Sequence, residues 1–556
     1  MHLLNKYLPR TEFESYDDLK KNYRVIVPED FNFAYDIVDE WARLDESKSA
    51  LVWRDDSGAE KRFTFRDLML LSNRAANLFL SKGIAKGDKV MLILKQRVEV
   101  WVCMLALHKI GAVVIPATYQ LTPKDIVYRC ESAQVRMIVA VDEPEVTKHI
   151  AASLDACTTL RYVGVVGEDI PDWAYDFRSE IERHSDRLER IPNRTTDDML
   201  IYFSSGTTGM PKMLLHDYSY PLGHIVTAKY WQCVEDGGLH LTASDSGWAK
   251  FGWGKIYGQW ICGAVIAAYD NEKFNARHML ETIRDLHLAT FCAPPTIYRF
   301  LIREEDVESY GLERIHHFCT AGEPLNPDII ERLRVLTGHE IYEGFGQSES
   351  TVLIANFPWM KVKPGAMGKP SPGYDIDIVD EDGHRCEDGI VGRVVVRDVD
   401  KYHPPGLIRE YYRDSAANEK AFHGGFYDTG DTAWRDSEGY FWYVGRSDDV
   451  IKCSGYRIGP FEVENALHTH AAVLECAVTA APDPIRGQVV KATIVLAPGC
   501  EPSDELKKDI QNHVKRVTAP YKYPRIVEFV SELPKTSSGK IRRVEIRARD
   551  NANGQQ

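Results

Sequence analysis

The sequence predicts an α/β protein built from two domains. We expect a large N-terminal domain of mixed α/β sheets with a small β-barrel-like part, and a smaller, mobile C-terminal α+β domain. Three observations predict this. Amphipathic helical segments alternate with short apolar runs up to about residue 300, short alternating strands follow near residue 370, and α/β alternation returns after residue 448. A chain of 556 residues can form several domains with a large core.

The segment from residue 64 to residue 83 is the clearest predicted helix. Thr64 suits the N-cap with Asp67 three residues later, and the apolar side chains of the segment fall on one face. The apolar run 90–94 then predicts a buried strand. Alternation of helix and strand at this spacing is typical of a parallel sheet covered by helices. A helix at 98–110 and strands at 112–116, 137–141, 162–166, 264–269 and 290–293 continue the pattern.

The pattern changes near residue 370. Residues 374–379 alternate apolar and polar side chains, turn at Glu381-Asp382-Gly383 and continue at 392–396. Two more short strands are predicted at 425–427 and 439–444. Alternating strands with Asp/Gly turns predict a small antiparallel barrel or sheet.

A polar break that contains a glycine, residues 445–449, precedes a new cycle of elements. Strands near 475–480 and 491–496 flank helices that start near Pro460 and Pro502. We therefore place a domain boundary at Asp448, with an N-terminal domain of residues 1–447 and a C-terminal domain of residues 448–556.

Composition excludes several classes of function. Apolar residues make up 44% and charged residues 27% of the chain, as in an ordinary soluble globular protein. The net charge is −14, and no Lys/Arg tract is present, which argues against a nucleic-acid or anionic-membrane binder. The longest apolar run, 256–269, is too short to span a membrane. The sequence does not decide whether the chain forms a homodimer.

The cysteines and the N-terminus predict a cytoplasmic location. Eleven cysteines are scattered without a Cys-x-x-Cys pair, which favours a reduced compartment over a disulfide framework or zinc site. The N-terminus has no apolar core typical of a signal peptide, and its early acidic residues disfavour a transit peptide.

The most prominent candidate for a ligand site is Ser204–Lys212, which follows the apolar residues 199–203. Two glycines let a backbone approach an anion closely, and four hydroxyls and one ammonium offer donors that suit phosphate oxygens. The spacing differs from the P-loop, because Met213 stands where a hydroxyl would bind magnesium. A polar surface loop is the alternative. The candidate phosphate contacts are Ser204, Ser205, Gly206, Thr207, Thr208, Gly209 and Lys212.

Three further stretches complement this loop. Residues 343–349 place Glu349 just after two glycines, where a carboxylate suits Mg²⁺ beside phosphate. Residues 427–431 place Asp431 at a turn, where it suits two ribose hydroxyls. Residues 534–540 form a second Ser/Gly/Lys loop. Taken singly, each has a structural explanation: a glycine turn, an Asp/Gly turn and a solvated tail.

In this order and spacing, these stretches make the chain resemble the adenylate-forming superfamily of acyl-CoA synthetases, carrier-protein adenylation domains and luciferase-like enzymes. The resemblance is greatest to the medium-chain acyl-CoA synthetase subfamily and covers residues 35 to 545. Its supporting segments are 204–212, 321–327, 343–349, 427–431, 445–459 and 534–540, with 293–299 and 519–525 pointing to the subfamily.

The resemblance implies a two-step reaction that uses ATP, Mg²⁺ and CoA. A carboxylate attacks the α-phosphate of ATP to give an acyl-adenylate and pyrophosphate, and the thiol of CoA then displaces AMP. The resemblance implies that Asp448 is the hinge about which the C-terminal domain rotates between the steps. It also implies that Lys540 and Arg457 are catalytic, with Lys540 acting in the first step.

The resemblance also assigns the binding residues. Residues 204–212 clasp the β- and γ-phosphates, Glu349 holds Mg²⁺, and Asp431 and Arg446 bind the ribose. The other ATP positions are Gly322, Glu323, Pro324, Glu343, Gly344, Phe345, Gly346, Gln347 and Ser348, of which the first six form the adenine slot. The CoA positions are Ser454, Gly455, Tyr456, Arg457, Arg486, Lys515, Tyr523 and Arg525.

A Cβ at Gly455 would narrow the passage for the pantetheine arm of CoA. For Arg486, Lys515 and Arg525, a solvated face is the alternative to CoA binding.

The sequence indicates only in part which carboxylic acid is the substrate. In relatives confined to acetate, a tryptophan precedes the glutamine of the Glu349 motif and closes the acyl pocket. This chain has Gly346 there, which favours a bulkier acyl group. Trp248 and Trp253 are candidates for lining the same pocket, with core packing as the alternative. Lys255 is either a contact for a polar substituent or an exposed helix lysine.

Short- to medium-chain acids, straight or branched, are the first expectation, and aryl acids such as benzoate are the second. A carrier-protein adenylation enzyme is disfavoured, because no Phe-Asp-x-Ser follows the phosphate loop and no carrier-like domain follows residue 549. The motifs do not separate the chain from a luciferase-like oxygenase, but the subfamily match disfavours that activity. A non-catalytic nucleotide-binding relative is disfavoured because Lys540, Glu349 and Arg446 are retained.

Overall fold

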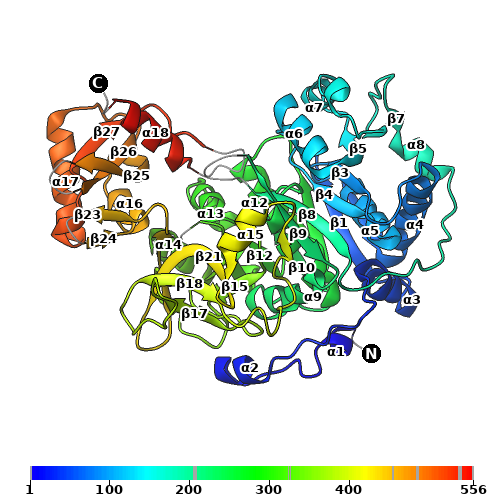
Figure 1. Cartoon of the computed structure of the whole chain (residues 1–556), viewed down its shortest axis with the longest axis horizontal. Helices are drawn as coiled ribbons and strands as arrows, with labels where there is room; N and C mark the ends of the chain where they lie inside the picture. The colour runs from blue at the N-terminus through cyan, green and yellow to red at the C-terminus, as the bar shows by residue number, and fades with distance from the viewer. Residues whose placement is uncertain are drawn as a thin grey trace. The chain divides into compact units, whose positions relative to one another are not determined.

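The structure is a computed structural model, drawn in Figure 1. It describes residues 3–204, 210–323, 325, 327–453, 456–483, 487–535 and 541–553. The chain forms two compact units. Unit 1 comprises Met1–Ser204, Lys212–Asp375 and Asp398–Asn418, and unit 2 comprises Ser205–Pro211, Ile376–Arg397 and Glu419–Gln556. Asp448 lies within unit 2, and the hinge and the domain boundary placed there stay predictions.

Unit 1 contains a nine-stranded sheet with the order β16-β15-β14-β13-β12-β10-β11-β1-β2. Its central strands pair in parallel and its outer strands antiparallel. The strands are β1 (Ser49–Asp55), β2 (Glu60–Thr64), β10 (Leu239–Thr242), β11 (Val265–Asp270), β12 (Thr290–Cys292), β13 (His317–Ala321), β14 (Ile341–Gly346), β15 (Val352–Ala355) and β16 (Lys369–Pro370).

A second, eight-stranded sheet of unit 1 has the order β19-β9-β8-β4-β3-β5-β6-β7. Among the described residues of this sheet, β8–β9 and β9–β19 pair antiparallel and the other strand pairs are parallel. The strands are β3 (Lys89–Ile93), β4 (Val113–Pro116), β5 (Val135–Val141), β6 (Tyr162–Val166), β7 (Tyr175–Asp176), β8 (Asp198–Ser204), β9 (Lys212–Asp217) and β19 (Glu410–Tyr411). The largely parallel pairing confirms the predicted α/β class.

Helices pack against these sheets, and α5, α6 and α7 contact strands β4 and β5 (Figure 1). The α-helices of this part are α1 (Leu4–Tyr7), α2 (Tyr16–Asn22), α3 (Glu40–Leu44), α4 (Phe65–Ser81), α5 (Glu99–Ile110), α6 (Pro123–Ala133), α7 (Pro144–Ala151), α8 (Phe177–Glu182), α9 (Tyr220–Ile225), α10 (Ala249–Gly254), α11 (Tyr257–Ile261), α12 (Ala276–Leu286), α13 (Pro295–Leu301) and α14 (Pro327–Thr337). The 3-10 and π-helical segments are η1 (Ala34–Asp39), η2 (Leu154–Ala156), η3 (Val226–Trp231), η4 (Val307–Tyr310) and η5 (Leu312–Arg314). Helix α15 (Ser415–Ala421) begins in unit 1 and ends in unit 2.

The predicted helix 64–83 is confirmed as α4. The Thr64 side chain accepts the N–H of Asp67, and the Asp67 carboxylate accepts the N–H of Thr64 at 2.8 Å. This capping box satisfies two backbone donors that the first turn leaves free. Its apolar face, which includes Phe65, Leu68 and Phe79, is buried.

Unit 2 contains two five-stranded sheets. The first, β17 (Ile376–Val379), β18 (Gly392–Val396), β20 (Phe422–His423), β21 (Phe426–Arg435) and β22 (Phe441–Arg446), is the predicted antiparallel part. Within the described residues its strand pairings follow an open path. The second combines β23 (Ile451–Cys453), β24 (Tyr456–Ile458), β25 (Val473–Asp483), β26 (Gly487–Leu496) and β27 (Ile526–Phe529) with α16 (Pro460–His468), α17 (Asp504–Val517), η6 (Pro520–Lys522) and α18 (Arg543–Asn553).

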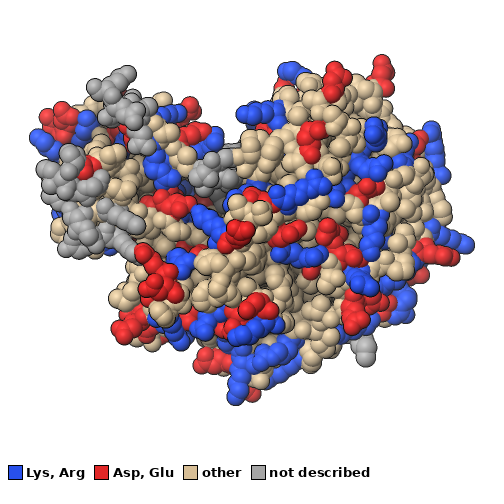
Figure 2. All heavy atoms as spheres, in the orientation of Figure 1, with Lys and Arg blue, Asp and Glu red and all other residues tan. Residues whose placement is uncertain are grey.

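Positive and negative side chains are interspersed on the face drawn in Figure 2. This agrees with the absence of a basic tract from the sequence. In the part of the chain that the structure describes, no helix has both the length and the apolar character needed to cross a bilayer.

Candidate functional site

The predicted phosphate loop connects β8 to β9. The two strands pair antiparallel, with Ser204 opposite Lys212. Both flanking residues are half-buried. The ammonium of Lys212 lies 4.8 Å from the centroid of the Tyr411 ring. Residues 205–209 lie outside the described residues.

Tyr411 also contacts the predicted magnesium ligand. Its hydroxyl donates to Glu349 Oε1 at 3.1 Å. The tyrosine is buried and lies on β19, where it pairs with Leu214 of β9. A single side chain thus contacts both the lysine of the phosphate loop and the predicted magnesium ligand.

Two further hydrogen bonds fix the backbone at Glu349. The N–H of Ile408 donates to the Glu349 carbonyl at 2.8 Å. His216 of β9 lies with Nε2 2.9 Å from the Ser348 carbonyl. The turn that carries Glu349 is therefore anchored to β9 and to the segment before β19.

The described residues predicted for the adenine slot lie on one strand, β14, or directly after its neighbour β13. In the parallel pair β13–β14, Thr320 is opposite Glu343 and Ala321 is opposite Gly344. Gly322 and Glu323 follow β13 directly, and the hydroxyl of Thr296 donates to Glu323 Oε2 at 2.7 Å. Phe345 and Gly346 complete β14, Gln347 and Ser348 follow it, and Pro324 lies outside the described residues.

Glu343 is a buried carboxyl group. Burial raises its pKa to about 8, against the opposing effect of the Leu325 N–H, which donates to it. Desolvation disfavours the charged form, so Glu343 is mostly neutral at pH 7.

Gly346 lies directly against the indole of Trp253 in α10. A Cβ at Gly346 would lie 2.4 Å from a ring carbon of Trp253 and 2.4 Å from the Thr351 carbonyl oxygen. Trp253 is buried, and its Nε1 donates to the Ser350 carbonyl at 3.2 Å. Two predicted pocket residues are therefore in contact, and the third, Trp248, is half-buried at the N-cap of α10.

Lys255 is not an exposed helix lysine. Its side chain is buried and donates to Gln96 Oε1 at 2.5 Å. Burial lowers its pKa to about 7, and the nearby carboxylate of Asp245 acts in the opposite direction. Lys255 is thus held by an internal partner.

In unit 2, the predicted ribose ligands are opposite each other on β21 and β22. Asp431 pairs with Arg446 in the strand register, and their side chains form an ion pair at 3.3 Å. The hydroxyl of Tyr443 donates to the other Asp431 oxygen at 3.2 Å. Asp431 is buried, and Arg446 remains partly exposed. Asp448 follows in an exposed turn.

Three of the predicted CoA positions form a cluster. The ammonium of Lys515 lies 4.1 Å from the Tyr523 ring centroid, and the guanidinium of Arg525 lies 5.0 Å from it. Arg525 also donates to the Tyr523 hydroxyl at 2.9 Å. Tyr456 and Arg457 lie on β24, while Ser454, Gly455, Arg486 and Lys540 lie outside the described residues.

Sequence reasoning missed Tyr411, Tyr443 and Thr296. Each contacts a predicted ligand-binding residue: Tyr411 contacts Glu349, Tyr443 contacts Asp431 and Thr296 contacts Glu323. Tyr443 carries a weak sequence signal, because it lies in a predicted strand next to Arg446. Tyr411 carries none, because a tyrosine in a two-residue strand has an ordinary structural explanation. Thr296 lies in the segment 293–299 that supports the resemblance, but that segment was not assigned to a ligand.

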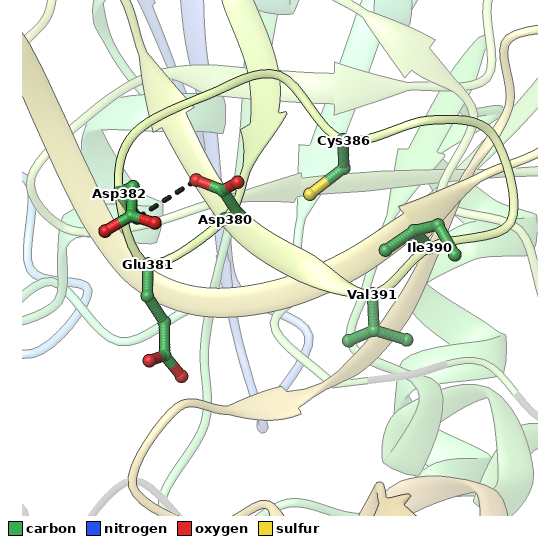
Figure 3. Close-up of a pocket in the computed structure, with 6 residues that line it drawn as sticks. All are labelled: Asp380, Glu381, Asp382, Cys386, Ile390 and Val391. Carbon is green, nitrogen blue, oxygen red and sulfur yellow. Dashed lines mark hydrogen bonds between the residues drawn. The ribbon is translucent and has the colours of Figure 1, made fainter.

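A separate cavity lies over the turn that follows β17 and is lined by Asp380, Glu381, Asp382, Cys386, Ile390 and Val391 (Figure 3). The Asp380 carboxylate accepts the backbone N–H groups of Asp382 and His384, at 3.0 and 2.9 Å. These three polar side chains are exposed. The cavity contains none of the predicted site residues, and its acids are explained by the turn.

Comparison with known proteins identifies two family regions. Residues 38–412 match the AMP-binding enzyme family, and residues 462–540 match the AMP-binding enzyme C-terminal domain. The chain is 40% identical to acyl-coenzyme A synthetase ACSM3, mitochondrial, of Mus musculus, over 97% of this chain and 94% of the relative. It is 41% identical to acyl-coenzyme A synthetase ACSM5, mitochondrial, of Homo sapiens, over 95% and 92%.

Solved structures agree with these matches. The anthranilate CoA ligase AuaEII in complex with anthranoyl-AMP superposes with a TM-score of 0.87 at 28% identity, covering 95% of this chain and 99% of that chain. A benzoate CoA ligase from Burkholderia xenovorans LB400 gives a TM-score of 0.82 at 26% identity, covering 93% and 100%. The predicted fold class and family resemblance are confirmed.

The prediction of a cytoplasmic location is wrong, because both relatives are named as mitochondrial enzymes. One of the acidic residues on which that prediction rested takes part in the fold, because Asp18 accepts a hydrogen bond from Arg10 at 2.9 Å. An acidic residue at this position is therefore weak evidence about location.

Proposed function

Since this chain belongs to the family of AMP-binding enzymes, we propose that it is an AMP-forming acid–thiol ligase, an acyl-CoA synthetase. It activates a carboxylic acid with ATP as an acyl-adenylate and transfers the acyl group to CoA. The observation that carries this proposal is the contact of Tyr411 with both Lys212 and Glu349. Through this tyrosine, the lysine of the predicted phosphate loop and the predicted magnesium ligand share one contact.

The phosphate loop and Glu349 would bind the triphosphate and Mg²⁺. Mg²⁺ is commonly held by one or two carboxylates together with phosphate oxygens and water, so a single half-buried carboxylate such as Glu349 fits the ion. When bound, the ion neutralises phosphate charge. Lys212 contributes a further positive charge, and the Tyr411 hydroxyl orients the carboxylate by donating to one of its oxygens.

The resemblance assigns the nucleoside to two sets of residues. Gly322 and Glu323 with Glu343–Phe345 supply the adenine slot. Asp431 supplies a carboxylate for the ribose hydroxyls. Arg446 and Tyr443 hold that carboxylate in place by contacting its two oxygens.

The second step would use the C-terminal domain, residues 448–556, after rotation at Asp448. Lys540 acts in adenylation, and Arg457 acts after rotation. Lys515, Tyr523 and Arg525 bind CoA phosphate, because two cations converge on one tyrosine there. Ser454, Gly455, Tyr456 and Arg486 complete the CoA positions.

The acyl group would lie beside Trp253 and Gly346. A short- to medium-chain acid, straight or branched, remains the first candidate. An aryl acid is the second, and it is favoured by the flat indole surface at Gly346 and by the anthranilate and benzoate ligases among the structural neighbours. Trp248 is a further lining candidate. The other proposed ligands are ATP and CoA. Light scattering would test whether the chain forms a homodimer.

The experiment that tests this function is a product analysis. The protein is incubated with Mg-ATP, CoA and a panel of linear, branched and aryl acids of increasing size, from acetate upward. We expect AMP and pyrophosphate in equal amounts with acyl-CoA. Formation of ADP in their place would falsify the proposal, and omission of CoA should leave acid-dependent ATP–pyrophosphate exchange intact.

A further inference from the structure

Four buried aromatic side chains adjoin the proposed acyl pocket: Tyr202 of β8, His216 of β9, and Tyr220 and His224 of α9. We call them the Tyr/His cluster. Each is at most 2% exposed. The ring centroids of His216 and Tyr220 lie 4.0 Å apart, those of Tyr220 and His224 4.6 Å, and those of Tyr202 and His216 5.8 Å.

The cluster carries polar atoms whose hydrogen-bonding capacity is unused. Tyr202 Oη, His216 Nδ1, Tyr220 Oη and His224 Nε2 are buried and make no hydrogen bond of normal geometry with any described residue. The two hydroxyls lie close enough to interact, but one bond between them would still leave one O–H without an acceptor. Buried polar atoms in proteins nearly always have a partner.

His240 of β10 is a buried histidine outside the cluster. His240 lies with Nδ1 2.7 Å from the Thr290 hydroxyl and Nε2 2.8 Å from the Thr242 hydroxyl. Both of its ring nitrogens therefore have partners. The unused atoms of the Tyr/His cluster thus set it apart from a fully paired core histidine.

The cluster is electrically neutral. Burial lowers the pKa of His216 to about 3 and that of His224 well below its ordinary value, and burial raises the pKa values of both tyrosines. His216 Nε2 faces the Ser348 carbonyl, which can only accept, so Nε2 carries the proton and Nδ1 is an acceptor. The cluster therefore offers an imidazole acceptor and a phenol donor, without charge.

The cluster borders the residues predicted to surround the acyl group. A Cβ at Gly252 would lie 2.7 Å from Tyr202 Oη and 3.2 Å from Tyr220 Oη, so this position faces both hydroxyls. The next residue is Trp253, whose indole lies against Gly346. The His224 ring lies 6.2 Å from the Trp253 ring. The Tyr/His cluster thus lies on the side of Trp253 and Gly252 that is formed by β8, β9 and α9.

We propose that the Tyr/His cluster binds a neutral hydrogen-bonding group on the acyl part of the substrate, a hydroxyl or an arylamine. Such a group donates to His216 Nδ1 and accepts from a tyrosine hydroxyl. The substrate is then a hydroxy- or amino-substituted carboxylic acid. This inference rests on the proposed function, because it concerns the acid that the same site activates.

The test compares matched acids. Benzoate is paired with each ring isomer of hydroxybenzoate and aminobenzoate, and a medium-chain acid is paired with its ω-hydroxy derivative. Acid-dependent pyrophosphate release gives kcat/KM for each. A site that hydrogen-bonds a substrate group discriminates strongly against the analogue that lacks it. We expect at least one substituted acid to exceed its parent by about tenfold or more in the unmodified enzyme.

Two isosteric variants assign the preference to the cluster. Tyr220→Phe should bring the ratio of kcat/KM values close to one. Tyr218→Phe removes a buried hydroxyl two residues away, one that donates to the His108 carbonyl at 2.9 Å outside the cluster, and should keep the ratio.

The possible outcomes distinguish failure of this inference from failure of the proposed function. Pyrophosphate release with parent acids but no preference for any substituted acid would overturn the inference alone. An equal change of the ratio in Tyr220→Phe and Tyr218→Phe would overturn it as well. Absence of pyrophosphate with every acid would overturn the proposed function and the inference with it.

Discussion

Replacement of Tyr411 by phenylalanine tests how the ATP site is assembled. The substitution keeps the ring beside Lys212 and removes only the hydroxyl that donates to Glu349 Oε1 at 3.1 Å. A hydrogen bond to a charged group contributes about 1.5–3 kcal/mol. Because Glu349 is only half-buried, we take the lower end, about 1.5 kcal/mol, which corresponds to roughly tenfold.

The assay is acid-dependent ATP–pyrophosphate exchange, measured over a range of Mg²⁺ concentrations. Tyr411→Phe should lower the exchange rate at limiting Mg²⁺ by about tenfold. A high Mg²⁺ concentration should restore part of the loss, because the hydroxyl orients the carboxylate that is proposed to hold the ion. Tyr411→Ala should lose more, because Lys212 then loses its contact with the ring.

The neighbouring Tyr412→Phe is the matched control. Tyr412 is half-buried, and its ring contacts the side chains of Lys89 and Arg413 instead of the ATP residues. Equal exchange rates for Tyr411→Phe, Tyr412→Phe and the unmodified enzyme at limiting Mg²⁺ would refute the assigned role of the hydroxyl. A loss in Tyr411→Phe that no Mg²⁺ concentration reduces would refute the link to the metal site.

Three further substitutions test other parts of the site. Burial raises the pKa of Glu343 from 4.5 to about 8. Between these two pH values the folded chain keeps the Glu343 proton, whereas the unfolded chain has lost it. The free energy of unfolding should fall by about 4–5 kcal/mol from this group as pH rises through that window, and Glu343→Gln should remove this fall in denaturant titrations. Lys540→Ala should slow ATP–pyrophosphate exchange by about a hundred- to a thousandfold and spare thioester formation from supplied acyl-adenylate; equal losses would contradict its role. Trp253→Leu should shift the chain-length profile toward bulkier acids, and an unchanged profile would place Trp253 outside the pocket.

Local features of the fold could be predicted from the sequence. The capping residues Thr64 and Asp67 predicted where α4 begins, because they act within one helical turn. The pairing of β19 with β9 could not be predicted, because β19 has two residues and shows no periodicity. For the same reason Tyr411 was missed. Of the two alternatives for Lys255, the exposed helix lysine is wrong; its burial could not be predicted, because its partner Gln96 is distant in sequence.

In the candidate site too, some residues could be predicted from the sequence and others could not. Asp431 and Arg446 could be assigned by resemblance, and the register of β21 and β22 brings them together. Tyr443, which holds the other Asp431 oxygen, was missed because a tyrosine in a strand is usually explained by packing. Motifs thus supply the residues that are predicted to meet the ligand, whereas the side chains that contact those residues are known only once the strand pairing is known.

The size of the acyl pocket shows why one position cannot be considered alone. A glycine at 346 suggested open space, but the Trp253 indole already lies where a side chain at 346 would begin. Replacement of Gly346 by tryptophan would also bring its Cβ to 2.4 Å from the backbone oxygen of Thr351, which a rotamer change cannot relieve. The activity of such a variant would therefore reflect backbone strain as well as a smaller pocket. The volume is therefore better tested at Trp253, where a smaller side chain removes ring atoms and leaves β14 unchanged.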